Sequence, residues 1–413
     1  MKGLLRLLVC ASVGMWLGLG ACGTAETPAS DGTGGAANPG QGGSPSGVGG
    51  ASAGLGGAAG SGGTTGLGGG AGANTGGAGS NGAGGAITGG GGGGGLPALI
   101  VDGNHLRDSA GNTVVLRGSS LIDIGSLYMF GGQSVAGITN RLDKVAAAGV
   151  QGHVVRMPVY PLITYNGTVP TCSPLPYPVG TGPSATCTPK MPLNAADYVS
   201  RVLKPAVDYA TSKGLYVIVD FHQIDNATTG TSAADARTFW TDIAPRFAGY
   251  TNVLYEIFNE PIDNKVPWST LKPVVQGLID VVRAAAPQNV IVVPSNAWDQ
   301  HTGDAVTNPP QGSNFMYTAH IYPANWSQAF QTQVATAVAS APVFVTEWGY
   351  TATDPNPHAW GTALQATIDA NGASWTAWVT DNGWSPPMFT STALTALTDF
   401  GTLTKTWLAA KGP

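Results

Sequence analysis

The stretch VLYEIFNEP at residues 253–261 decides the fold. Its first half is a short, non-alternating run of apolar residues, which is typical of a strand that is buried on both faces. Its second half carries Asn259 and Glu260. A charged side chain at the end of a buried strand is costly unless it is paired or functional. The stretch therefore predicts a parallel sheet that carries chemistry at the carboxyl end of its strands.

Seven further runs of this kind surround it, and helical patterns separate most of them. The predicted strands cover residues 114–119, 153–159, 215–222, 253–259, 290–295, 315–322, 343–348 and 374–379. The predicted helices cover residues 138–148, 195–213, 233–247, 271–285, 327–339, 359–369 and 394–410, with no clear helix in residues 296–314. This alternation predicts an α/β fold, a closed (β/α)8 TIM barrel, rather than a doubly wound sheet. Two short extended runs in residues 98–112 predict a short β-hairpin before it.

The carboxyl ends of the strands should hold the functional residues, because active sites of such barrels lie there. Nearly every strand ends on a titratable or aromatic group. These residues are Arg156, His222, Asn259, Glu260, His320, Tyr322, Glu347 and Trp378. Glu256 lies four residues before Glu260, and we expect it to form a buried ion pair or hydrogen bond. So many costly side chains at one end of a barrel predict a catalytic site there.

The catalytic half of the chain resembles glycoside hydrolase family 5, the cellulase family, within the clan of retaining (β/α)8-barrel glycosidases. The resemblance covers about residues 115–390 and rests on six strings: VRMP at 155–158, VDFH at 219–222, YEIFNEP at 255–261, AHIY at 319–322, VTEWG at 345–349 and WTAW at 375–378. NEP alone is a weak signal. NEP followed by HxY and then by TEWG at this spacing is specific.

The resemblance implies a retaining double displacement, which needs two carboxyl groups about 5–5.5 Å apart. Glu260 would be the general acid/base, and Glu347 would be the nucleophile. Arg156 and Tyr322 would hydrogen-bond Glu347 and keep it charged. This mechanism needs no cofactor and no metal.

The remaining residues of the resemblance would bind the sugar. Asn259 would donate to the 2-hydroxyl, and His222 and His320 would bind hydroxyls or orient the carboxylates. Trp378 would be the platform for the cleaved sugar, with Trp375 as the rival. Three loop tryptophans could either extend the cleft or pack as ordinary loop residues. They are Trp298, Trp326 and Trp384.

Several functions remain open within and beyond this family. An endo-β-1,4-glucanase (cellulase) acting on a β-glucan is preferred, with an endo-β-1,4-mannanase or glucomannanase and an exo-β-glucanase as alternatives, because loops set the substrate. A non-catalytic surface carbohydrate-binding protein is disfavoured, since both carboxylates are present. A metal-dependent hydrolase using His222, Asp225, His320 and Glu260 is disfavoured, since no strand carries His-x-His.

Composition supports an uncharged ligand. The net charge is −5 without a basic stripe, so no nucleic-acid partner is expected. Charged residues make up 10% of the chain and aromatic residues 8%, which suits a neutral ligand that stacks, although the glycine-rich segment dilutes the charge. A barrel of this size needs no partner subunit, so a monomer is expected.

The first 96 residues predict export and display. Lys2 and Arg6 precede an apolar run that ends in LGAC at residues 19–22, which resembles the lipobox of bacterial lipoproteins. We expect residues 1–21 to be a signal peptide and Cys22 to anchor the protein to a bacterial membrane or cell surface, with plain secretion to the exterior as the alternative. Residues 22–96 have almost no large apolar side chains and predict a disordered linker. The catalytic domain would be residues 97–413.

Cys172 and Cys187 flank a loop rich in proline and glycine. An exported protein favours a disulfide between them, and the loop of residues 161–193 would wall one side of the cleft.

Overall fold

The computed structural model describes residues 95–160, 195–262 and 266–411. The expected signal peptide with Cys22, the linker up to residue 94, and the pair Cys172 and Cys187 lie outside these residues. Among the described helices, none is long and apolar enough to cross a membrane.

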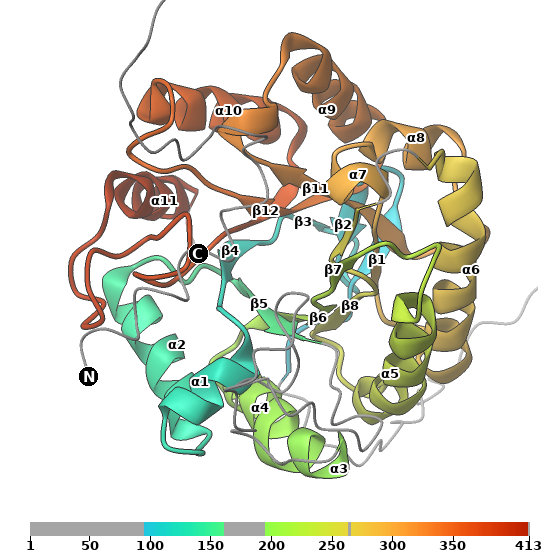
Figure 1. Ribbon diagram of the computed structural model, residues 1–413, viewed down its shortest axis with the longest axis horizontal. Coiled ribbons are helices and arrows are strands. Elements are labelled where there is room, and N and C mark those ends of the chain that lie inside the picture. Colours follow the sequence, from blue (N-terminus) through green and yellow to red (C-terminus); the bar gives the residue numbers. More distant parts are fainter. Residues whose placement is uncertain (1–94, 161–194, 263–265, 412–413) are drawn as a thin grey trace, which may run out of the picture. The chain divides into compact units, whose positions relative to one another are not determined.

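Eight parallel strands close into a barrel inside a ring of helices (Figure 1). In order around the barrel they are β10 (Ile291–Val293), β11 (Phe315–Ile321), β12 (Val343–Trp348), β13 (Ser374–Ala377), β4 (Arg117–Ser120), β5 (Val154–Val159), β6 (Tyr216–Phe221) and β8 (Val253–Glu256). Apart from Arg117, every residue of these strands is buried, because side chains fill the interior and helices cover the outside. The predicted TIM barrel is confirmed.

The helices of the ring follow the strands in sequence. They are α1 (Ile124–Phe130), α2 (Ala136–Ala148), α3 (Ala195–Tyr198), α4 (Lys204–Ser212), α5 (Ser232–Phe247), α6 (Trp268–Ala285), α7 (Asn296–Asp299), α8 (Thr302–Thr307), α9 (Gln328–Ser340), α10 (Pro357–Asn371) and α11 (Asp399–Ala410). A π-helical turn, η2 (Val199–Leu203), joins α3 to α4, and a 3-10 turn, η3 (Pro323–Asn325), follows β11.

Three predictions about these elements were wrong in detail. α1 was not predicted, because it is short and buried on most sides and so shows no amphipathic period. α11 begins at Asp399 rather than 394, since Leu394 has a positive φ of 58° and the Thr398 side chain caps the helix. The region 296–314 holds two short helical segments, α7 and α8, instead of irregular chain or a single turn.

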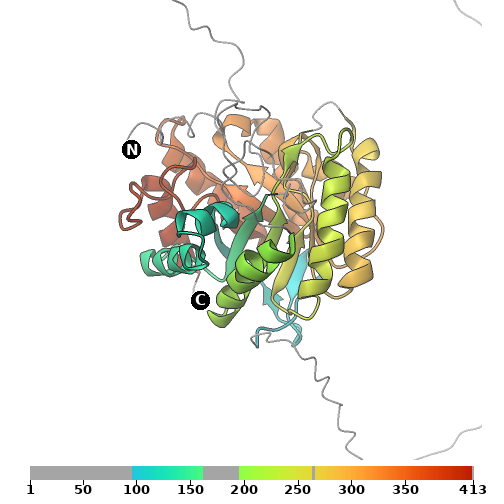
Figure 2. The ribbon, with the colours of Figure 1, turned by 60° about the horizontal axis from the view of Figure 1, so that its bottom comes forward.

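The amino end of the barrel is covered by an antiparallel sheet of β1 (Ile100–Asp102), β2 (His105–Arg107) and β3 (Thr113–Val114), seen below the barrel in Figure 2. The predicted hairpin is confirmed as β1 and β2, and β3 adds a third strand. Leu99 and Leu106 pack with the lower side chains of the barrel in one apolar cluster. This end is therefore a packed base.

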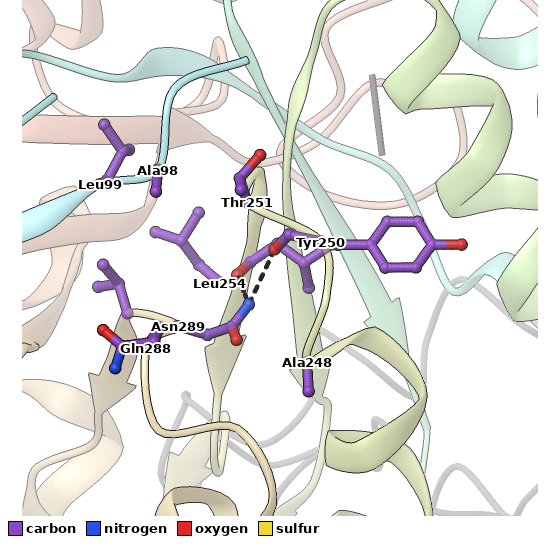
Figure 3. Close-up of a pocket in the computed structure, with 10 residues that line it drawn as sticks. Ala98, Leu99, Ala248, Tyr250, Thr251, Leu254, Gln288 and Asn289 are labelled. Carbon is purple, nitrogen blue, oxygen red and sulfur yellow. Dashed lines mark hydrogen bonds between the residues drawn. The ribbon is translucent and has the colours of Figure 1, made fainter. Parts of the chain in front are cut away.

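A small pocket lies at this base, and Ala98 and Leu99 line one side of it (Figure 3). Leu99, Leu254 and Asn289 are among its lining residues. The Asn289 side-chain amide donates to the backbone oxygens of Tyr250 and Val253, at 2.9 Å each. The amide donor of Asn289 thus joins two loops at the amino end, and none of the predicted catalytic side chains lines the pocket.

Candidate active site

Two glutamates face each other at the carboxyl end of the barrel. Glu347 lies on β12. Glu260 begins β9 (Glu260–Pro261), which pairs with β7 (Ile224–Asp225) in a small parallel sheet just beyond β8. One carboxylate oxygen of each lies within 4.8 Å of the other. That separation leaves room for a single reacting atom between them and is close to the spacing of retaining glycosidases.

His320 on β11 bridges the two carboxylates. Its Nδ1 lies 2.7 Å from Oε1 of Glu260 and 3.7 Å from Oε2 of Glu347. Although burial favours the neutral ring, the charge of Glu347 and the nearby carboxylates of Glu256 and Glu260 raise the pKa of His320 well above its usual value. A protonated His320 donates from Nδ1 to Glu260.

Glu347 is held in its charged form. Its Oε1 accepts from Nη1 of Arg156 and its Oε2 from the Tyr322 hydroxyl, both at 2.6 Å. Burial opposes ionisation, but the charges of His320 and Arg156 outweigh it and keep the pKa of Glu347 below its usual value. Both expected partners of Glu347 are in place, and the carboxylate is oriented by two strong bonds.

Arg156 is the hub of this charge network. Its side chain is fully buried on β5, and its Nε donates to Glu256 at 2.6 Å. Its Nη2 lies 2.9 Å from Asp220. The expected buried ion pair of Glu256 is confirmed, and although burial works against it, the Arg156 charge lowers the pKa of Glu256 to about 2. A buried cation with three carboxylate partners fixes the geometry of the floor of the site.

The side-chain amide of Asn259 is only partly paired among the described residues. Its Oδ1 accepts from Nη2 of Arg156 at 2.6 Å, which orients the amide. Its Nδ2 is buried and finds no hydrogen-bond partner among the described residues. An unpaired buried donor is costly, so it indicates a group that a ligand completes.

His222 and Trp378 form the neighbouring wall. The rings stack at 5.2 Å between centroids and 10° between planes, and Nδ1 of His222 bonds to Asp220 at 2.6 Å. Burial and then the charge of Arg156 lower the pKa of His222 to about 4, so the ring is neutral at physiological pH. A neutral imidazole beside an indole presents an uncharged surface.

The structure distinguishes the two rival tryptophans, Trp375 on β13 and Trp378 directly after it. Trp378 lies at the mouth beside His222, with its Nε1 donating to the Ser385 oxygen at 3.1 Å. Trp375 is fully buried and stacks on Trp407 at 4.2 Å between ring centroids. Of the two, only Trp378 is placed at the site.

The loop tryptophans differ in their surroundings. Trp384 lies near the site, 6.3 Å from Trp378 between ring centroids. Trp326 packs edge-on against Phe330 and Trp360 on the outer helices, which is ordinary loop packing. Trp298 belongs to α7, in the loop after β10.

Two residues at the site were missed by the sequence reading. Tyr160 follows β5 and packs edge-on against His222, at 4.8 Å between ring centroids. Asp299 is fully buried and its Oδ2 lies 3.8 Å from Nε2 of His320. Burial raises the pKa of Asp299 well above its usual value, so any charge on it depends on a protonated His320. Both residues lie beyond the ends of apolar runs. Tyr160 directly follows its strand and could have been found there, whereas no local pattern marks Asp299.

The backbone around Asp299 is unusual. Ala297, Trp298 and Asp299 have φ values of 55°, 56° and 57°, a left-handed turn of three consecutive residues that are not glycine. Such a conformation costs roughly 1–2 kcal/mol for each L-residue, so the surrounding structure must hold it.

Glu260, His320 and Glu347 are also the one group of three close ligand atoms in the part of the chain that the structure describes. Of the four ligands considered for a metal hydrolase, Asp225 is engaged elsewhere, accepting from the Ser232 hydroxyl and the Asn226 backbone. The charges of Arg156 and of protonated His320 repel a cation at this point. The residue set therefore suits proton transfer better than metal binding.

Comparison with known proteins places this arrangement in a family. The family described as Cellulase (glycosyl hydrolase family 5) matches residues 108–383. An endoglucanase of Microbulbifer sp. strain ALW1 is 34% identical over 194 residues, 44% of this chain and 37% of the relative. Endoglucanase E-5 of Thermobifida fusca is 36% identical over 182 residues, 42% of this chain and 39% of the relative. The match thus spans about two fifths of the length of these relatives.

Solved structures agree on the fold. A β-glucanase from Saccharophagus degradans superposes with a TM-score of 0.63 at 22% identity, covering 76% of this chain and 94% of that one. The catalytic domain of an endoglucanase from Thermobifida fusca gives a TM-score of 0.58 at 25% identity, with 76% and 97% covered. With a matching family profile over most of the catalytic domain, the chain belongs to glycosyl hydrolase family 5, the cellulase family.

Proposed function

We propose that this protein is a retaining endo-β-1,4-glucanase that cleaves β-glucan chains, with Glu260 as the general acid/base and Glu347 as the nucleophile. The observation that carries the proposal is the asymmetry of the two carboxylates, which lie within 4.8 Å of each other. Glu347 is bound by a cation and a hydroxyl. Among the residues that the structure describes, the Glu260 carboxylate hydrogen-bonds to His320 alone, and its side chain is more exposed, at 12% against 6%. One group is thus built to stay charged and the other to exchange protons with solvent.

The reaction proceeds in two displacements. Glu347 attacks the anomeric carbon, the bond to the leaving oxygen breaks, and Glu260 gives its proton to that oxygen. Water then attacks the same carbon and returns a proton to Glu260, and Glu347 leaves. The unpaired Nδ2 of Asn259 would bind the 2-hydroxyl, a bond that strengthens in the oxocarbenium-like transition state.

The glucan substrate is inferred from relatives and from the character of the wall. The similar proteins of Microbulbifer and Thermobifida fusca are named endoglucanases. Trp378 and the neutral His222 present a flat, uncharged surface that suits the apolar face of a pyranose.

The test is an assay of residues 97–413 on carboxymethylcellulose, with mannan, xylan and laminarin alongside. We expect reducing ends and rapid loss of viscosity on the cellulose derivative. Glu347→Ala should reduce the rate by roughly 10⁴–10⁶-fold, as removal of a nucleophile does in other hydrolases. Asp369→Asn, a change in an outer hydrogen-bond network with Trp407, is the matched control and should keep full activity. Activity confined to mannan would change the substrate, and no activity on any polymer would contradict the proposal.

We also propose, from the sequence, that the protein is exported and anchored through a lipid on Cys22, with residues 22–96 as its linker. We further propose that Cys172 and Cys187 form a disulfide and that the protein is a monomer. The LGAC string at residues 19–22 supports the anchor. Labelled palmitate should enter the full-length chain and be absent from Cys22→Ser, and a soluble, unlabelled wild-type protein would contradict the anchor.

A further inference from the structure

A buried carboxylate lies behind the histidine that links the two catalytic glutamates. Asp299 is fully buried at the end of α7, and its Oδ1 accepts from the Ser295 backbone N–H at 2.5 Å. Its Oδ2 has no hydrogen-bond partner among the described residues and lies 3.8 Å from Nε2 of His320. The side chain is therefore aimed at the rear of the imidazole.

The backbone is bent to place it there. The three consecutive left-handed residues that end in Asp299 turn the chain inward, and Figure 1 shows α7 inside the ring of outer helices. The Thr302 hydroxyl donates to the Thr318 oxygen of β11 at 2.8 Å, which ties the segment to the strand that carries His320. A conformation that L-residues rarely adopt, held in place at a functional site, points to a role for the side chain it positions.

His320 has charged groups on both sides. At Nδ1 it meets the two catalytic carboxylates. At Nε2 it bonds to a threonine hydroxyl and has two further carboxylates within 4 Å. The distances are 2.7 Å to Glu260, 3.7 Å to Glu347, 3.0 Å to Thr346, 3.8 Å to Asp299 and 3.9 Å to Glu256. Glu256 also pairs with Arg156, whereas His320 is the cationic group found within ion-pair distance of Asp299 among the described residues.

We propose that Asp299 is a positioning residue that acts through His320 and keeps the imidazole protonated on both nitrogens while the glycosyl-enzyme exists. This inference rests on the proposed double displacement. When Glu347 becomes an ester, its negative charge beside His320 disappears, and Glu260 has just lost its proton. The Nδ1 proton then faces a basic carboxylate 2.7 Å away.

Transfer of that proton to Glu260 would stop the reaction, because a protonated carboxyl cannot accept a proton from the attacking water. A carboxylate behind Nε2 holds the positive charge on the ring and so opposes this transfer. Asp299 would thereby preserve Glu260 as the general base of the second displacement without touching the sugar.

The test is Asp299→Asn, which keeps the shape and an oxygen for the Ser295 N–H but removes the charge. With an aryl β-cellobioside that has a good leaving group, we expect the second displacement to slow by about 10-fold to 100-fold, part of the contribution of a general base. Then kcat and KM fall together while kcat/KM changes little, a burst of phenol appears, and the acidic limb of the kcat–pH profile, which reports the loss of Glu260 as a base, moves to higher pH. Asp369→Asn is the control and should change none of these.

Rates are expressed per active site titrated with a slow fluorinated substrate, so that partial misfolding lowers only the titre. Wild-type kcat and an unmoved acidic limb in Asp299→Asn would overturn the role of Asp299. In the wild-type enzyme, nitrogen-15 NMR of the trapped glycosyl-enzyme should show both ring nitrogens of His320 protonated at neutral pH, and a neutral ring would equally overturn it. A wild-type enzyme that neither turns over nor traps the glycoside would instead refute the proposed function.

Discussion

Asn259 at the carboxyl end of the barrel and Asn289 at its amino end are both buried, but their amide groups have different partners. Nδ2 of Asn289 donates to two backbone oxygens and joins two loops (Figure 3). Nδ2 of Asn259 donates to nothing among the described residues. At the base the amide donor of Asn289 joins two loops, although its Oδ1 is unpaired among the described residues, whereas at the mouth the amide donor of Asn259 is left for a ligand to complete. The difference teaches that burial alone does not separate structural from functional polar residues, and that an unpaired amide donor beside the catalytic carboxylates is more informative than burial.

The largest expected contrast comes from the tryptophans at the last strand. Trp375→Ala empties a space in the stack with Trp407 and should lower the free energy of unfolding by about 3–5 kcal/mol. Trp378→Ala should leave stability less affected and lower kcat/KM by about 10-fold to 100-fold, because the sugar loses a stacking surface worth about 1.5–3 kcal/mol. Urea unfolding and steady-state kinetics measure the two effects. If Trp375→Ala and Trp378→Ala lost equal stability and Trp378→Ala kept the wild-type kcat/KM, the contrast would be wrong.

The two asparagines test the comparison itself. Asn259→Ala should lower kcat/KM by about 10²–10³-fold, the usual effect of removing one donor to a developing transition-state charge, with little change in unfolding. Asn289→Ala should lower the free energy of unfolding by about 1–3 kcal/mol and leave kcat/KM unchanged below the transition. A 2-deoxy substrate supplies the check, since the wild type and Asn259→Ala should cleave it at similar rates. A large remaining difference on that substrate would assign Asn259 a different role.

These contrasts also mark where sequence reading works. The strands were predicted because each is a run of buried apolar residues, and the residues at their ends, from Arg156 to Trp378, were found because polar groups stand out against those runs. The structure brings these side chains together at one mouth. α1 and α7 were missed because a few residues carry no periodicity. Asp299 was missed because its importance comes from a left-handed turn toward His320, and no local pattern encodes that contact.

A smaller effect concerns the dependence of stability on pH at the mouth. Asp123 is buried at the start of α1, and burial raises its pKa to about 6 from the usual 3.8, although it accepts bonds from the Ser126 backbone and hydroxyl. A carboxyl whose folded pKa is raised stabilises the fold below the unfolded pKa, and this contribution is lost as the pH rises through about 6. The loss amounts to at most about 3 kcal/mol.

Asp123→Asn keeps a side-chain oxygen to cap α1 and removes the ionisable group, so this pH-dependent loss of stability disappears. Between pH 4 and pH 7 the wild type should therefore lose stability relative to the variant, measured as the difference in urea unfolding at each pH. Parallel profiles for the two proteins would show that Asp123 ionises normally within the fold.

The assignment of Glu347 as nucleophile is tested most directly by trapping the glycosyl-enzyme. A 2-deoxy-2-fluoro-β-cellobioside with an activated leaving group should add one fluorocellobiosyl unit to the protein, and peptide mass spectrometry should locate it on Glu347, with no label on Glu347→Gln. A label on Glu260, or turnover of the ordinary glycoside with inversion at the anomeric carbon, would contradict the proposed mechanism.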